Sequence, residues 1–169
     1  MHRKYLGDSY DAVKRLWQQI FAPWAPLHAN ERFIPAELRG DFTKLTGIEM
    51  ANLALTGAYS LLNDPDTGVR LPGKTDQSEG KHVAIATILG QLDQPRVKCV
   101  VTFDQSNYRS DGTLKWQRLQ KLNALRSEGA HGFYYVSHAP FLFSAGSTAN
   151  LRKVRARLIA AGVPENRIE

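Results

Sequence analysis

The stretch Val97-Lys98-Cys99-Val100-Val101-Thr102-Phe103, followed by Asp104, decides the fold class. Its almost continuous apolar residues are typical of a strand that is buried on both faces of a parallel sheet. Cys99, the only cysteine, lies within this run, where cysteine is usually a small buried side chain rather than a nucleophile. We therefore expect a buried strand with the carboxylate of Asp104 at its carboxyl end.

Helix and strand patterns alternate on both sides of this strand. Apolar residues at helical spacing, with glycine or proline stops, predict helices at residues 9–22, 35–46, 83–92, 114–128 and 148–161. The expected caps are Asp8 or Ser9 for the first of these helices, Thr113 for the fourth and Ser147 for the fifth. Short apolar runs between turn signals predict further strands at residues 58–62, 132–136 and 141–143, and one short strand before Gly7.

This alternation predicts an α/β fold, with a three-layer, mainly parallel, Rossmann-like sheet and helices on both of its faces. The length of 169 residues suits a single α/β domain over residues 1–169. Ligands bind beyond the carboxyl ends of the strands in such sheets, so strand-end residues are the first candidates for a site.

The helix at residues 114–128 has a mixed pattern. We expect it to bury the apolar side chains Trp116, Leu119, Leu122 and Leu125. We expect it to expose the basic side chains Lys115, Arg118, Lys121 and Arg126.

Composition and charge narrow the class of protein. Apolar residues make up 43% of the chain, and no run approaches the roughly 20 apolar residues of a membrane span. The first residues are charged and lack the apolar stretch of a secretory signal, so a cytoplasmic protein without a membrane partner is expected. The net charge of +6 favours a nucleic acid or nucleotide as partner.

Acidic residues follow two of the predicted strands. Asp64-Pro65-Asp66-Thr67-Gly68 follows one and Asp104 follows the next, so Asp64 and Asp104 should end adjacent strands on the same edge of the sheet. Pro65 stiffens the segment, and paired oxygen ligands suit Mg²⁺ or Mn²⁺. The sequence therefore predicts a metal site of Asp64, Asp66 and Asp104. The alternative is a plain turn, because Asp, Pro and Gly are common turn residues.

Two histidines and two basic residues complete the candidate site. His82 and His138 are candidates for general acid–base catalysis, because histidine exchanges protons near neutral pH. Lys81 and Arg109 are candidates for binding phosphate oxygens. The alternatives are a polar helix start for His82, a structural core histidine for His138 and a solvated surface charge for Lys81 or Arg109.

The sequence argues against several well-known kinds of catalytic and binding site. Gly7-Asp8-Ser9 lacks the second glycine of a serine-hydrolase nucleophile elbow, and Asp8 is explained as a helix cap. Neither a glycine-rich dinucleotide motif nor a P-loop occurs. A single cysteine excludes cysteine-based zinc sites.

Four segments of the chain form one set of motifs: Tyr5-Leu6-Gly7-Asp8-Ser9-Tyr10-Asp11-Ala12-Val13-Lys14-Arg15, Leu62-Asn63-Asp64-Pro65-Asp66-Thr67-Gly68, Lys81-His82 and Phe103-Asp104-Gln105-Ser106. With them the chain resembles a group of uncharacterised bacterial and prophage α/β proteins that have an Asp-Pro-Asp-(Thr or Asn)-Gly strand end. The resemblance spans most of the chain. It implies an α/β domain with shared strand-end residues, and it implies no reaction.

These features favour a divalent-metal-dependent hydrolase that acts on phosphoester bonds of a nucleic acid or nucleotide. One alternative is a non-enzymatic accessory module of phage or prophage type, which binds nucleic acid or a host protein through the basic faces of its last two helices. Another alternative is a transferase-like Rossmann domain that binds a nucleoside-containing cofactor at the same strand ends.

Overall fold

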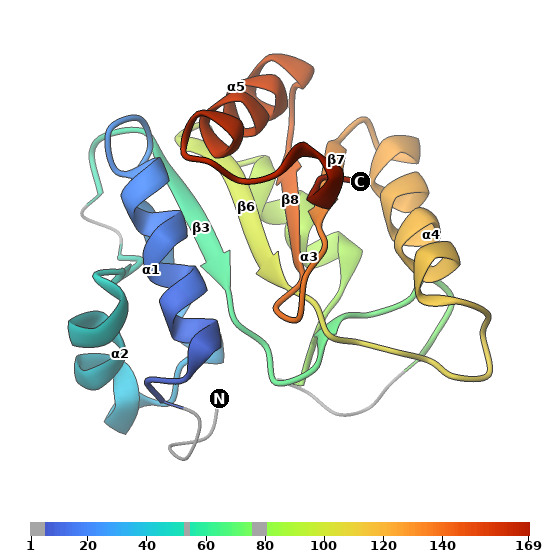
Figure 1. The fold of residues 1–169 in the computed structure, drawn as a ribbon, viewed down its shortest axis with the longest axis horizontal. Helices are drawn as coiled ribbons and strands as arrows, with labels where there is room; N and C mark the ends of the chain where they lie inside the picture. Colours follow the sequence, from blue (N-terminus) through green and yellow to red (C-terminus); the bar gives the residue numbers. More distant parts are fainter. Residues whose placement is uncertain (1–5, 53–54, 76–80) are drawn as a thin grey trace.

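A computed structural model describes residues 6–52, 55–75 and 81–169 of the chain (Figure 1). The short strand expected before Gly7 lies outside these residues, apart from Leu6. None of the helices in the described ranges is both long and apolar enough to cross a membrane.

A six-stranded sheet forms the centre of the molecule, with the strand order β2-β1-β3-β6-β8-β7. In chain order its strands are β1 (Leu27–Ala29), β2 (Glu49–Met50), β3 (Tyr59–Asn63), β6 (Val97–Phe103), β7 (His131–Tyr135) and β8 (Phe141–Ala145). The pairs β2–β1, β1–β3 and β3–β6 are parallel, whereas β6–β8 and β8–β7 are antiparallel. The α/β class is confirmed, and the sheet is mixed with mostly parallel strands.

The antiparallel part of the sheet has a simple cause. Only residues 136–140 connect β7 to β8, and a parallel pair needs a crossover of a dozen or more residues. The two strands therefore form a hairpin, with β7 at one edge of the sheet.

In the described ranges, five α-helices flank the sheet: α1 (Ser9–Phe21), α2 (Arg39–Thr46), α3 (Ile85–Leu92), α4 (Leu114–Ser127) and α5 (Thr148–Ala160). Single turns of 3₁₀ helix lie at η2 (Glu31–Phe33), η3 (Ala36–Leu38) and η4 (Glu165–Arg167). The caps predicted at Asp8, Thr113 and Ser147 are confirmed, because each side chain accepts a hydrogen bond from a backbone N–H of its helix. The helix expected from Pro35 instead begins with the 3₁₀ turn η3, and α2 follows.

The sheet separates two apolar cores, one on each face. The first contains side chains of α1, α2 and α5, such as Trp17, Phe42 and Leu158. The second contains side chains of α3 and α4, such as Ile88 and Leu125. Helices therefore cover both faces, as predicted. Figure 1 shows α1 and α2 at one end of the molecule and α4 at the other.

Cys99 is fully buried in the first core, and burial raises the pKa of its thiol. A thiol in such surroundings is a poor nucleophile. The prediction of a buried, structural cysteine is confirmed.

The buried face of α4 differs from the prediction. Trp116 and Leu119 are each 46% exposed, whereas Lys121 is 1% exposed. The helix packs on the sheet through Leu122 and Leu125, and the same face turns Lys121 toward a buried carboxylate. An ion pair thus sets the rotation of the helix about its axis, which apolar spacing alone does not predict.

A small parallel pair, β4 (Gly68–Val69) and β5 (His82–Val83), lies beside the carboxyl end of β6. The N–H of Gln105 donates to the carbonyl of Thr67 at 3.0 Å, and the N–H of Val69 donates to Asp104 Oδ1 at 2.9 Å. His82 was expected to open a helix, but it lies in β5 and α3 begins at Ile85. Because His82 and Val83 pair with β4, they are not part of the helix.

Gly68 allows β4 to approach Asp104. Its φ is +138°, and a Cβ at this position would overlap Asp104 Oδ1 and lie 2.7 Å from Asp104 Cα. Any larger side chain would therefore push β4 away from the end of β6.

We predict that Gly68→Ala lowers the free energy of unfolding by more than about 2 kcal/mol, because overpacking adds to the strain of a positive φ. Gly73→Ala is the matched control, since Gly73 also has a positive φ of +81°, but a Cβ added there would meet no atom of the described chain within 4 Å. Urea denaturation of both variants measures the difference. Equal losses would contradict the close packing of Gly68 on Asp104.

Candidate functional site

The carboxyl edge of the sheet brings Asp64 and Asp104 onto adjacent strands. Asp64 follows β3 and Asp104 follows β6, and these strands are parallel with Asn63 opposite Thr102. The placement predicted from the alternating elements is confirmed. Both aspartates are about 5% exposed, so each needs a buried partner for its charge.

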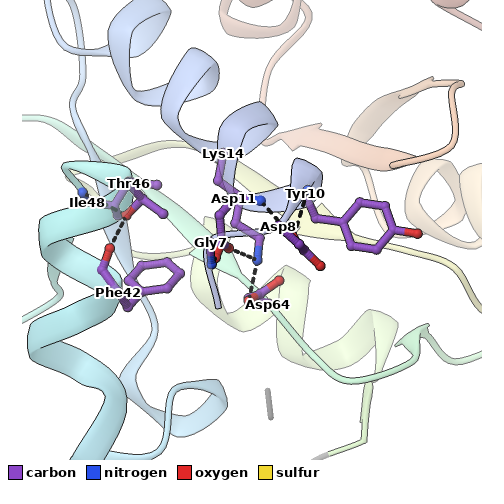
Figure 2. A network of polar contacts seen from close by, with 9 residues as sticks. All are labelled: Gly7, Asp8, Tyr10, Asp11, Lys14, Phe42, Thr46, Ile48 and Asp64. Atoms are coloured by element: carbon purple, nitrogen blue, oxygen red, sulfur yellow. Dashed lines mark hydrogen bonds and ion pairs between the residues drawn. The ribbon is translucent and has the colours of Figure 1, made fainter. Parts of the chain in front are cut away.

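Lys14 of α1 is the partner of Asp64. Its Nζ donates to Asp64 Oδ2 at 2.7 Å and to Asp11 Oδ1 at 2.9 Å (Figure 2). Asp11 Oδ2 in turn accepts from the N–H of Gly7 at 2.7 Å. Residues 7–14 thus have two structural roles. Asp8 caps α1, and Lys14 places its ammonium group beside Asp64, directly after β3.

The charge of Lys14 is held by its two carboxylates. Burial opposes the ammonium form, but Asp64 and Asp11 outweigh it and raise the pKa of Lys14 above its ordinary value. Lys14 is therefore charged at neutral pH, and the network is an ion triad.

Asp104 has a separate set of partners. Its Oδ2 accepts from Lys121 Nζ and from the Tyr134 hydroxyl, both at 2.7 Å. Its Oδ1 accepts from the N–H groups of Val69 and Ser106, at 2.9 and 3.2 Å, and lies 2.6 Å from Ser106 Oγ. Lys121 Nζ also donates to Ser106 Oγ at 2.6 Å. Asp104 thereby connects β6 to β4, α4 and β7.

Burial dominates the electrostatics around Asp104. It lowers the pKa of Lys121, although the Asp104 carboxylate opposes this shift. Burial and the same carboxylate both raise the pKa of Tyr134, so this hydroxyl stays protonated and donates to Asp104.

These contacts bear on the expected Mg²⁺ or Mn²⁺ site. A carboxylate offers about four lone-pair positions, and the donors around Asp104 already occupy both of its oxygens. Asp66 is exposed, and no group of three or more His, Cys, Asp or Glu side chains in the described part of the chain is arranged to hold a metal ion. A metal bound by Asp64, Asp66 and Asp104 stays a prediction.

A pocket of about 300 Å³ opens beside Asp104, between the end of β6, the first half of α4 and the turn after β7. Lys121 and Arg118 line it from α4, and His138 lines it from the turn. The His138 ring is exposed and stacks on Tyr10 at 5.7 Å between ring centroids. The pocket therefore combines a buried ion pair with an accessible histidine and an arginine.

Gln117 holds the loop that borders this pocket. Its Nε2 donates to the carbonyls of Tyr108 and Gly112, at 2.8 and 3.1 Å, and its Oε1 accepts from the N–H of Tyr108 at 3.0 Å. Gln105, at the start of the loop, donates through Nε2 to the Tyr10 hydroxyl at 2.7 Å. The loop is thus tied to α4 at one end and to α1 at the other.

The remaining predicted residues lie elsewhere. His82 stacks on Tyr108, at 6.0 Å between centroids, and Lys81 and Arg109 are exposed. None of these three is among the residues that line the pocket beside Asp104. Of the predicted residues, Asp104 and His138 line this pocket.

Sequence reasoning missed Lys14, Lys121, Tyr134 and Arg118 as site residues. A signal for Lys14 exists, because Asp11 and Lys14 are three residues apart on one helix face. Lys121 stands in a row of charged and apolar residues on α4, where nothing distinguishes it from a surface lysine.

Comparison of the chain with family models, with curated proteins and with solved structures finds no match. The resemblance to bacterial and prophage proteins therefore stays a prediction. The function has to be argued from the site itself.

We predict that Lys14→Met destabilises the protein by about 3–5 kcal/mol at pH 7, because it leaves Asp11 and Asp64 buried without their cation. Lys44→Met is the control, since Lys44 is an exposed lysine on α2. Urea denaturation gives both values. A loss no larger than that of the control would show that the triad contributes nothing to the fold.

The stability loss of the Lys14→Met variant should depend on pH. Burial raises the pKa of Asp64, and without Lys14 less opposes this shift. The folded variant then takes up a proton that the unfolded chain, with its lower carboxyl pKa, does not. Its deficit relative to wild type should therefore shrink as the pH falls from 7 toward 4. A deficit that grows on acidification would contradict this account.

Proposed function

We propose that the pocket beside Asp104 binds a phosphoester of a nucleotide or nucleic acid and hydrolyses it with His138 as the general acid–base. The observation that supports this proposal is one pocket with an accessible histidine, an arginine and a buried lysine–aspartate pair, at the carboxyl edge of the sheet. Ligands of open α/β sheets bind at this edge.

Arg118 is the phosphate-binding group in this proposal. Its guanidinium lies over the Tyr134 ring, 5.7 Å from the centroid, and 3.5 Å from Glu169 Oε2. The planar fork of arginine matches two phosphate oxygens, and a doubly charged phosphate competes well with a single carboxylate. Stacking on Tyr134 keeps the guanidinium beside the pocket while it changes partner.

Arg118 supplies the net positive charge on this wall of the pocket. Asp104 neutralises the buried Lys121 ammonium group, so the lysine–aspartate pair adds a fixed dipole. Fixed charges in a partly buried site stabilise negative charge that develops on phosphoryl oxygens, because they need no reorganisation.

His138 is placed for proton transfer. The Gln105 side chain donates to the His138 carbonyl at 3.1 Å, and Tyr10 stacks against the imidazole. These contacts hold His138 beside the pocket. There it takes a proton from the attacking water or delivers one to the leaving oxygen.

The proposed reaction differs from the sequence-based hypothesis in its use of metal. Lys14 and Lys121 already pair with Asp64 and Asp104, so the proposal routes no step through Mg²⁺ or Mn²⁺. A Rossmann-like sheet, the nucleoside-cofactor transferase that depends on it, and a cytoplasmic location stay predictions.

We predict that His138→Gln lowers hydrolysis of bis(p-nitrophenyl) phosphate by about 10²-fold or more, because general acid–base catalysis contributes this much. His82→Gln is the matched control, because His82 does not line the pocket. Rates should persist in EDTA. Equal losses in both histidine variants would contradict the assignment, and activity that requires added Mn²⁺ would favour the aspartate metal site.

A second pair of variants tests phosphate binding. Arg118→Gln should raise KM for the same substrate, because the guanidinium binds the phosphate, while Arg109→Gln should leave KM unchanged. Steady-state kinetics at fixed ionic strength give both constants. A KM effect for Arg109 but not for Arg118 would place the phosphate elsewhere.

A further inference from the structure

A second charged pocket, of about 260 Å³, lies at the amino end of β7. Arg126 lines it from the last turn of α4, and Arg152 and Arg155 line it from α5. His131, the first residue of β7, lines the pocket between the two helices. Among the described residues its lining includes no acidic side chain, so positive charge from two helices converges on one place.

The pocket lies at a stretch of the sheet edge that no other strand of the described residues covers. Beyond β7, the carboxyl-terminal segment pairs with Tyr134 and Val136, whose N–H groups donate to Glu169 and Arg167 carbonyls at 2.8 and 2.7 Å. Peptide groups alternate along a strand, so the N–H of Gly132 points to the same outer side as that of Tyr134. Gly132 is among the lining residues and adds a backbone donor.

The absence of a side chain at Gly132 affects how closely α4 packs on β7 beside this pocket. A Cβ there would lie 3.1 Å from Leu122 Cδ2 and 3.2 Å from Leu125 Cδ1. The glycine thus lets α4 pack closely on β7, and this packing brings Arg126 near the edge strand.

Within the part of the chain that the structure describes, little neutralises these arginines. Arg155 approaches Glu165 at 3.8 Å, in an exposed and therefore weak ion pair. Arg126 is 3.4 Å from the amide oxygen of Asn123, a neutral partner. The first turn of α5 begins at Thr148, also in the lining, and its N–H groups add positive potential.

We propose that this pocket, defined by Arg126, His131, Arg152 and Arg155, is a binding site for the phosphate backbone of a nucleic acid. Exposed guanidinium groups on two helices, a backbone donor and a net charge of +6 complement a chain of phosphates. The five residues of β7, roughly 17 Å of strand, separate this pocket from the one beside Asp104. The inference is independent of the proposed hydrolysis.

The test is binding of fluorescently labelled oligothymidylate to the full chain, measured by anisotropy over a range of salt concentrations. Arg126→Gln combined with Arg152→Gln should weaken binding by about tenfold or more. It should also lower the slope of log affinity against log salt by about 1.4, or about 0.7 for each phosphate of a single strand that is no longer neutralised. Arg15→Gln with Lys44→Gln, which removes two exposed charges from α1 and α2, should leave both values close to wild type.

Three results would overturn the proposal. Wild-type protein with no salt-dependent affinity would remove its basis, and equal losses in the two double variants would show diffuse charge rather than a site. Self-association of the Arg126→Gln, Arg152→Gln variant with unchanged oligonucleotide affinity would show that the arginines only keep the edge strand from pairing with a second copy.

Discussion

Two buried lysine–aspartate contacts hold the carboxyl edge of the sheet. Lys14 binds Asp64 at the end of β3, and Lys121 binds Asp104 at the end of β6. A buried charge without a partner is costly, so each lysine–aspartate contact stabilises the folded chain. Through the two aspartates, α1 contacts the end of β3, and α4 and β4 contact the end of β6.

Because of these ion pairs, the strand-end aspartates have a structural role, and other residues face the pocket. Asp64 and Asp104 lie at the edge where α/β proteins bind ligands, but Lys14 binds one oxygen of Asp64 and internal donors bind both oxygens of Asp104. The groups left facing the pocket come from neighbouring segments, namely Arg118 on α4 and His138 after β7. Rigid strand ends thus support a site whose reactive groups lie on a helix and a turn.

The features of the fold that depend on local sequence patterns could be predicted. The apolar run at β6, the caps at Asp8 and Thr113, and the adjacent strand ends of Asp64 and Asp104 were all predicted and are confirmed. The buried face of α4 was not, because a pairing between Lys121 and Asp104 spans 17 positions and leaves no periodic trace. Likewise, nothing local distinguishes an aspartate that binds a metal from one that binds a lysine.

The most direct measurement is a crystal structure of the protein grown with adenosine monophosphate and Mn²⁺. Our account predicts the phosphoryl group in the pocket beside Asp104, within hydrogen-bonding distance of Arg118 and His138, with Lys14 and Lys121 still bound to their aspartates. Mn²⁺ bound between Asp64 and Asp104, with either lysine displaced, would contradict the account. It would restore the metal site that the strand-end aspartates suggest from sequence alone.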